Sequence, residues 1–369
     1  METQKTIVLL ISMAETSQAF SIGIFLMLLN RKKKNSLLLL GMFLFVLGLS
    51  SLPDIINYFD KDFKLGIDFF VLVPALLYSY VDNLVILKKS NDIKIITRIG
   101  IVGVAISIVL NLFFPFNEES VVSVVYHFLY YFFVFVFIIS VFVATYRRIK
   151  KNNKRLKNQY SSTENRDLLW VSLLLQFLLV YFLFGILEGF LDFIPELYED
   201  VLIALWGLFF TFWASYHGLL QQVSKNLISE SEKQEAETIF LENEKAIEEH
   251  KDIDRYKTIL TSIEVLMEKE ELYLNPDLTI VNVSEHINEH PRLISKVINT
   301  LNNENFNSFI NRYRVEKAKT MLLNEESNHL NIEGIGNSAG FKSNSSFYTA
   351  FKKYQNSTPS KFIKTAKGA

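Results

Sequence analysis

Hydrophobic residues form long runs in the first 220 residues of the chain and become sparser and periodic after that point. A bilayer core about 30 Å thick requires about 20 apolar residues from each helix that crosses it. Seven stretches meet this requirement and predict a bundle of seven transmembrane helices. They are 7–29, 36–56, 67–87, 95–115, 121–145, 168–188 and 200–220.

A polar, acidic segment at 221–255 separates this hydrophobic half from the rest of the chain. A heptad that begins at Leu220 loses its apolar positions by Glu230, so a long coiled coil is not supported. The charge run indicates only that the segment is solvated. We therefore predict a linker, for which a solvated helix and a flexible tether are equally good descriptions.

The region 256–369 has the periodicity of a soluble helical domain. A short helix, a three-residue turn and a second helix form the pattern of a helix-turn-helix unit. This pattern occurs twice, on either side of one long helix, so the whole chain is predicted to be all-α. The predicted helices are 256–273, 280–287, 291–301, 306–323, 332–339 and 343–354.

The composition removes several kinds of chemistry. The 369 residues include no cysteine, which excludes disulfides, thiolate metal sites and cysteine nucleophiles.

Residues 286–290 spell H-x-x-E-H, a pattern of some zinc proteases. That chemistry needs both histidines on one helix, whereas Pro291 directly afterwards predicts a helix end and a turn. We therefore expect no catalytic residue, no metal ligand and no cofactor.

Positive charge is unevenly distributed among the loops of the hydrophobic half. If the N-terminus lies outside, the cytoplasmic loops are 30–35, 88–94 and 146–167, and they hold 15 Lys and Arg against three in the outer segments. Short cytoplasmic loops carry such an excess. The loop charges thus predict a multi-pass membrane protein with everything after about residue 221 in the cytoplasm.

Three ionisable residues within or at the ends of the predicted spans are candidates for sensing a ligand. They are Glu15, His127 and Glu188. Ionisable groups inside a bilayer are costly and usually face a partner or a cavity. A ligand pocket open to the outside and polar contacts between helices both explain them.

The cytoplasmic region carries the residue types that bind DNA. Residues 340–369 contain six lysines and no acidic residue, which is typical of a phosphate-binding surface. In the first helix-turn-helix unit, the second helix, 291–301, is expected to expose side chains that contact phosphates and base edges. These are Arg292, Ser295, Lys296 and Asn299.

Residues 332–362 follow the pattern I-x-x-I-x-x-x-x-G-F, then a serine-rich helix with F-x-x-x-F-K-K, then T-P-x-x-F. Together with Tyr313-Arg314 in the long helix, this pattern resembles the DNA-binding domain of AraC/XylS-type transcription regulators over about residues 260–366. The resemblance implies that the second unit also reads DNA. Its expected contacts are Lys342, Asn344, Ser345, Ser346 and Thr349, with Lys352 and Lys353 at phosphates.

The sequence departs from the family pattern in both units. Gly336 stands where the second motif has alanine, and Asn356 stands where a glycine precedes T-P. In the first unit, Asn288 replaces the turn glycine. Asparagine tolerates the left-handed backbone conformation, so the turn at Asn356 can be retained.

The resemblance and the predicted spans together imply a membrane-bound transcription regulator. Its expected partners are double-stranded DNA, the lipid bilayer, an unidentified ligand and RNA polymerase, and a homodimer is expected from half-site logic. The alternative is a transporter-like or receptor bundle with a cytoplasmic protein-binding domain.

Overall fold

The protein is described from a computed structural model, which gives the structure of residues 2–29, 36–59, 67–85, 90–113, 121–164, 167–188, 196–227, 253–324 and 330–367. The chain divides into two compact units. One comprises Met1–Asn152 and Leu168–Lys225, and the other comprises Asn153–Asp167 and Asn226–Ala369. Each unit is helical throughout its described residues, apart from turns and one isolated β-bridge.

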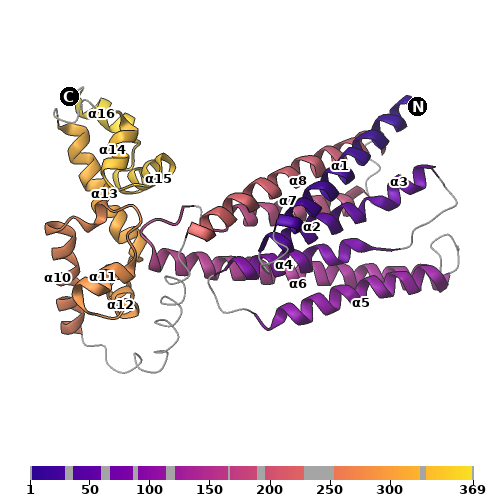
Figure 1. Cartoon of the computed structure of the whole chain (residues 1–369), viewed down its shortest axis with the longest axis horizontal. Coiled ribbons are helices and arrows are strands. Elements are labelled where there is room, and N and C mark those ends of the chain that lie inside the picture. The colour runs from indigo at the N-terminus through magenta and orange to yellow at the C-terminus, as the bar shows by residue number, and fades with distance from the viewer. Residues whose placement is uncertain are drawn as a thin grey trace. The chain divides into compact units, whose positions relative to one another are not determined.

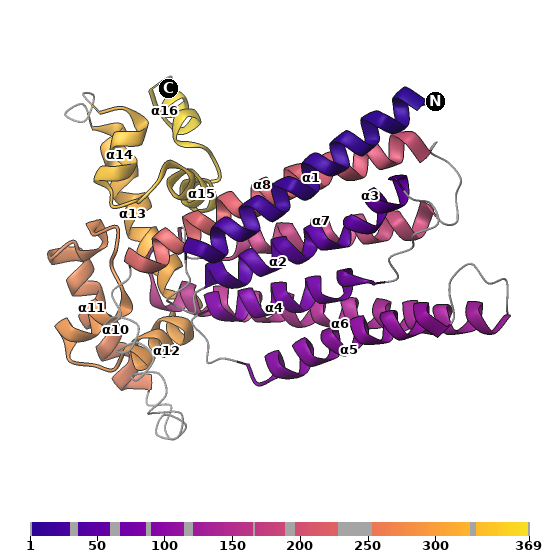
Figure 2. The same cartoon turned by 45° about the vertical axis from the view of Figure 1, so that its right-hand side comes forward.

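The first unit is a bundle of long helices (Figure 1). In both Figure 1 and Figure 2, α1 lies alongside α2, and α5 lies alongside α6. Most helices of this unit overlap a predicted span. The helices are α1 (Glu2–Leu29), α2 (Ser36–Ser50), α3 (Leu52–Phe59), α4 (Leu72–Leu84), α5 (Asp92–Phe113), α6 (Val121–Gln159), α7 (Leu169–Glu188) and α8 (Glu196–Leu227).

Three described helices are long and apolar enough to cross a membrane, whereas the sequence predicts seven spans. The three lie at Thr6–Leu29, Asp92–Phe113 and Val121–Gln159. Shorter apolar helices cover Ser36–Ser50, Phe69–Leu84 and Leu169–Val180.

The stretch predicted as one span at 36–56 is divided between two helices. α2 ends at Ser50 and α3 begins at Leu52. Pro53 has no backbone N–H and cannot continue the hydrogen-bond ladder of α2, so a new helix starts there. The stretch predicted at 67–87 also begins late, because Asp68 accepts a hydrogen bond from the Phe70 amide (3.1 Å) and caps a 3₁₀ turn before α4.

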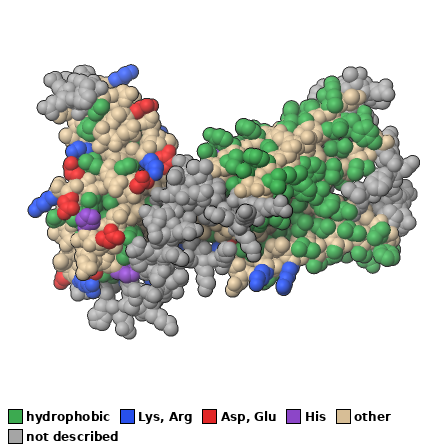
Figure 3. Space-filling view, in the orientation of Figure 1, with side chains coloured by type: hydrophobic (Ala, Val, Ile, Leu, Met, Phe, Trp, Pro, Cys, Tyr) green, Lys and Arg blue, Asp and Glu red, His purple; other side chains and the backbone are tan. Residues whose placement is uncertain are grey.

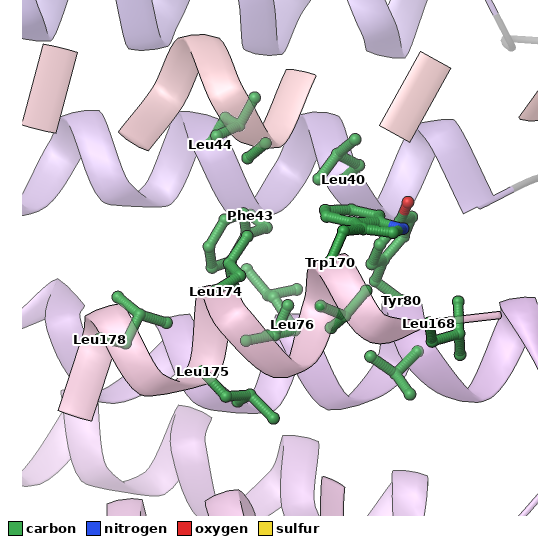
Figure 4. Close-up of a cluster of buried hydrophobic side chains, with 14 of the residues drawn as sticks. Leu40, Phe43, Leu44, Leu76, Tyr80, Leu168, Trp170, Leu174, Leu175 and Leu178 are labelled. Carbon is green, nitrogen blue, oxygen red and sulfur yellow. The ribbon is translucent and has the colours of Figure 1, made fainter. Parts of the chain in front are cut away.

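The larger of two buried apolar clusters in the described part of the first unit is built mainly from α2, α4, α7 and α8. Phe43 and Leu44 of α2, Tyr80 of α4, and Trp170 and Leu174 of α7 are all buried in it (Figure 4). The rings of Tyr80 and Trp170 meet edge to face, with centroids 6.1 Å apart. Aromatic and leucine side chains of this size dominate the energy of a packed interior.

The outer surface of the first unit is also apolar. Figure 3 shows one face of it largely covered by hydrophobic side chains. On α6, Phe128, Phe132 and Val136 are exposed although they lie in the middle of an apolar helix. Exposed apolar surface of this extent is typical of a surface that meets lipid, which favours insertion of these helices in a membrane.

The second unit contains the two predicted helix-turn-helix units. The boundaries predicted for 280–287, 291–301 and 306–323 are confirmed, whereas the first helix begins and ends earlier than predicted. The helices are α10 (Ile253–Lys269), α11 (Ile280–Ile287), α12 (Pro291–Leu301), α13 (Phe306–Leu323), α14 (Ile332–Ser338), α15 (Asn344–Gln355) and α16 (Pro359–Lys367). Of the predicted linker 221–255, residues 228–252 lie outside the described residues.

The long helix α13 belongs to two separate cores. Phe306, Phe309 and Ile310 pack with α10, α11 and α12, whereas Ala318 and Leu322 pack with α14 and α15. Figures 1 and 2 both show α13 between these two groups of helices. The second unit is therefore two small helical cores that share one helix.

The turn of the second helix-turn-helix unit requires a glycine at position 340. Gly340 has a φ of +90°, and a Cβ there would lie 2.5 Å from the Tyr273 carbonyl oxygen and 2.8 Å from Leu274 Cα. Asn356 also has a positive φ, of 52°, but its side chain is exposed. Backbone atoms therefore surround position 340, whereas the side chain at position 356 is exposed.

We expect Gly340→Ala to destabilise this half of the domain by about 2 kcal/mol, because the substitution combines backbone strain with a clash against fixed main-chain atoms. Hydrogen exchange of peptides from 332–355, measured by mass spectrometry on the full chain in detergent, should show faster exchange. Asn356→Gly is the matched control and should leave exchange nearly unchanged. Equal protection in both variants would contradict the steric argument.

Candidate nucleic-acid interface

Local capping defines the first helix-turn-helix unit. The Thr279 hydroxyl accepts a hydrogen bond from the Asn282 amide (3.2 Å), and the Asn282 side chain accepts one from the Thr279 amide (2.9 Å). At the other end of α11, Asn288 takes the left-handed conformation (φ 53°). Pro291 then starts α12, as predicted, because its fixed φ suits the first helical position.

The two histidines of the H-x-x-E-H pattern do not share a helix. α11 ends at Ile287, and His290 caps the next helix by accepting a hydrogen bond from the Arg292 amide at 3.2 Å. His286 instead contacts the Asn282 carbonyl of its own helix. Among the residues that the structure describes, no three His, Asp or Glu side chains are grouped to hold a metal ion.

The structure places three of the four predicted contacts of α12 at least partly at the surface. Asn299 is exposed, and Arg292 and Lys296 are half-buried. The Lys296 ammonium lies 5.9 Å from the centre of the Tyr256 ring. This ring supports the lysine stem near the surface.

The expectation that Ser295 is exposed is wrong, because this side chain is 7% exposed. It follows Pro291 by four residues and precedes Ile298 by three, and both of these are buried, so helical periodicity places Ser295 on the inner stripe. Asn299 donates to the Ser295 carbonyl at 2.6 Å. Ser295 can thus orient Asn299 but does not itself face solvent.

In the second helix-turn-helix unit, Ser343 caps α15 by accepting a hydrogen bond from the Ser346 amide at 3.3 Å. Ser346 also donates its hydroxyl to the Ser343 carbonyl (2.9 Å) and is half-buried, as is Asn344. The remaining predicted contacts of this unit are exposed. They are Lys342, Ser345, Thr349, Lys352 and Lys353.

Two of these lysines already have partners within the domain. The Lys342 ammonium lies 2.6 Å from an Asp277 carboxylate oxygen, and Lys353 donates to the Ser308 hydroxyl at 3.1 Å. Both bonds join the second helix-turn-helix unit to residues of the first half. Exposed ion pairs contribute little to stability, so a phosphate can replace these partners at low cost.

The three candidates for sensing a ligand belong to the helical bundle Met1–Asn152 and Leu168–Lys225, and each has different surroundings. The Glu15 carboxylate lies against Gly207 of α8, so closely that a Cβ at that glycine would overlap it. His127 is buried, and its Nδ1 is 2.9 Å from the Ser123 carbonyl oxygen of the same helix. Glu188 ends α7, and its side chain lies outside the described residues.

A buried ion pair that the sequence analysis did not identify joins α4 to α6. The Asp82 carboxylate contacts the Arg148 guanidinium, with exposures of 0% and 15%, and also accepts a hydrogen bond from the Ser90 amide at 3.2 Å. Arg148 was counted only as a loop charge. The missed signal is Asp82, an acidic residue well inside the apolar run 67–87, whose position requires a partner.

Comparison with known proteins supports the assignment of a helix-turn-helix domain to the second compact unit. Residues 283–365, well under half of the chain, match the family model of a helix-turn-helix domain. The C-terminal region therefore holds a helix-turn-helix domain, which implies DNA binding. No curated protein matches the chain.

Two solved structures are similar to part of the chain. A protein of unknown function from Listeria innocua is 22% identical over 29% of this chain and 95% of its own length, with a TM-score of 0.25. The C-terminal domain of AraT, a response regulator from Geobacillus stearothermophilus, is 27% identical over 29% of this chain and 84% of its own length, also with a TM-score of 0.25. At these TM-scores neither similarity bears on the fold or the function of this chain.

We expect Asp82→Asn to destabilise the first unit by about 3 kcal/mol, because it leaves the charge of Arg148 buried without its carboxylate partner. Tryptophan fluorescence during denaturation in detergent measures this unit selectively, since all three tryptophans lie in it. Asp92→Asn, at an exposed position of α5, is the control and should change stability by less than about 1 kcal/mol. Equal midpoints for the two variants would show that the buried pair has no special role.

Proposed function

We propose that this protein is a membrane-anchored, sequence-specific DNA-binding transcription regulator. The observation that carries the proposal is the coexistence of long apolar helices with exposed apolar surfaces and a domain with two helix-turn-helix units. DNA is the ligand that this domain class binds. The apolar helices supply the membrane anchor.

The two second helices of these units are suited to adjacent sites on DNA. α13, which joins the two cores, has 18 residues and is about 27 Å long at 1.5 Å per residue. Two recognition helices separated by such a spacer can enter successive major grooves, about 34 Å apart. We propose base contacts from Arg292, Lys296, Asn299 and the exposed residues of α15, with Lys352 and Lys353 at phosphates.

We propose further that the first unit crosses the inner membrane seven times with the N-terminus outside. The 15 to 3 excess of Lys and Arg in one set of loops supports this topology. In this arrangement residues 221–369 are cytoplasmic and reach DNA while anchored. A homodimer and contact with RNA polymerase belong to the same proposal.

In the mechanism we propose, a ligand from outside or from the membrane changes the helix packing of the bundle. Glu15, His127 and Glu188 are the candidate groups for this ligand. A ligand can shift the protein only by its differential affinity for two arrangements of the bundle. The linker 221–255 would then change the pairing or the orientation of the DNA-binding domains.

We expect Lys296→Glu combined with Lys342→Glu to weaken DNA binding at least 100-fold and to reduce the dependence on salt, because two positive charges of the DNA-contacting surface become negative and are repelled by the DNA. The measurement is fluorescence anisotropy of the full chain in nanodiscs with a labelled duplex from upstream of its own gene, beside a scrambled duplex, at about 50 to 200 mM salt. Lys257→Glu combined with Lys269→Glu, two exposed lysines of α10 outside α12 and the basic segment 340–369, is the charge-matched control.

The parent chain should prefer the native duplex, and its binding should weaken steeply with salt. Parent binding that does not depend on Lys296 and Lys342 would instead favour the transporter-like or receptor bundle with a protein-binding domain.

A further inference from the structure

The DNA-binding unit includes a short segment that comes from a distant part of the sequence. Asn153–Asp167 belongs to the same compact unit as Asn226–Ala369. Tyr160 directly follows the last residue of α6 and forms an antiparallel β-bridge with Thr279. The Ser161 amide donates to the Leu278 carbonyl at 3.0 Å. This segment therefore adds a strand-like edge to the loop that precedes α11.

Ser161 uses every polar group it has in this contact. Besides its backbone amide, its carbonyl oxygen accepts from the Asn307 side-chain Nδ2 at 2.6 Å and from Arg314 Nη1 at 3.3 Å. Its hydroxyl accepts from Arg314 Nη2 at 3.0 Å. Ser161 and Arg314 are each 1% exposed. A serine so fully bonded and buried is part of a specific docking contact.

Arg314 lies at the junction of the two helix-turn-helix units. From α13 it donates to the carbonyl oxygens of Tyr273 and Asn275, both at 2.7 Å, and its guanidinium lies 5.9 Å from the centre of the Phe341 ring. Burial lowers the pKa of Arg314 to about 10, so the side chain remains charged at neutral pH. Because a buried cation needs hydrogen-bond partners, the two bonds from Ser161 complete its surroundings.

We infer that residues 153–162 are a docking element that completes the bonding of Arg314 and so fixes how the two helix-turn-helix units are set against each other. The inference rests on the proposed function as a DNA-binding regulator. Without the element, Arg314 keeps its bonds to Tyr273 and Asn275, so the domain can remain folded while its two halves lose part of their restraint. Docked and released forms of one folded domain are what a regulatory contact requires.

The position of the segment indicates which helix acts on the bond between Ser161 and Arg314. Tyr160 is the residue after α6, which is one of three described helices long and apolar enough to cross a membrane. A movement of α6 therefore acts directly on the bond between Ser161 and Arg314, by a route that does not involve the linker 221–255. When the spacing of the two recognition helices is fixed before DNA binds, less conformational entropy is lost on binding, and the affinity is higher.

The contact can be tested with engineered cysteines, since the chain has none of its own. The Ser161–Leu278 hydrogen bond makes Tyr160 and Thr279 a non-hydrogen-bonded pair, with Cα atoms expected about 4.5 Å apart, within the range of a disulfide. In the full chain in nanodiscs, Tyr160→Cys with Thr279→Cys should cross-link on oxidation. A protease site inserted in 228–252 lets a non-reducing gel reveal the joined fragments. Lys157→Cys with Thr279→Cys, from an exposed position of α6, should remain separable.

The functional effect is measured with Ser161→Leu, which places a bulky apolar side chain beside the Arg314 guanidinium. It should abolish cross-linking of the 160–279 pair and weaken binding to the upstream duplex about tenfold. Thr261→Leu, at an exposed position of α10 outside this segment, should match the parent chain in both assays. Unchanged hydrogen exchange of peptides from 332–355 in Ser161→Leu would show that the domain is still folded.

Each outcome distinguishes the inference from the proposed function. Failure of the 160–279 pair to cross-link, with normal DNA binding, would overturn the docking element and leave the regulator proposal intact. Efficient cross-linking with DNA affinity that Ser161→Leu does not lower would overturn the coupling. Cross-linking in a chain that does not prefer the native duplex would support the docking contact and refute the proposed function.

Discussion

The arrangement of the DNA-binding unit depends on one buried cation. Arg314 lies midway along α13, after the residues that build the first core and before those that build the second. Its guanidinium donates hydrogen bonds to carbonyl and hydroxyl oxygens. Such a charge is stable in the interior only where several acceptors converge on it. The loop before α11, the turn before α15 and the segment after α6 must therefore all keep their positions around it.

This constraint explains why features distant in the sequence occur together. Gly340 is required because the turn of the second unit passes against the carbonyl of Tyr273, which also accepts a bond from Arg314. The nearby Lys342–Asp277 pair joins the same two segments at the surface. The two helix-turn-helix units are thus connected by a buried polar contact with an exposed ion pair beside it, and not only by the shared helix.

The helices of this unit were predictable because their signals are local. Thr279, Pro291 and the apolar periodicity of α13 each act within a few residues, and the corresponding boundaries are confirmed. Ser295 was misplaced because a small polar residue beside a buried stripe was assigned to the surface by its type. The role of Arg314 was not predictable, since Ser161 lies 153 residues before it and carries no pattern of its own.

In the hydrophobic half, composition predicted apolar helices but not their lengths or their internal pairs. Pro53 divides one predicted span, and the capped turn at Asp68 shortens another. The Asp82–Arg148 pair shows that one charge assigned to a loop also serves to join two helices. Topology rules count such residues without reference to their contacts, so a pairing of this kind becomes visible only in three dimensions.

The central claim is that Arg314 and its partners fix the distance between α12 and α15. Spin labels on Thr300→Cys and Thr349→Cys, both exposed, would report this distance by pulsed electron paramagnetic resonance on the full chain in nanodiscs. We expect one narrow distribution in the parent chain and a clearly broader one in Arg314→Lys, which cannot make the same set of bonds. Arg312→Lys, at an exposed neighbouring position, should leave the distribution narrow. A distribution that stays equally narrow in Arg314→Lys would contradict the account.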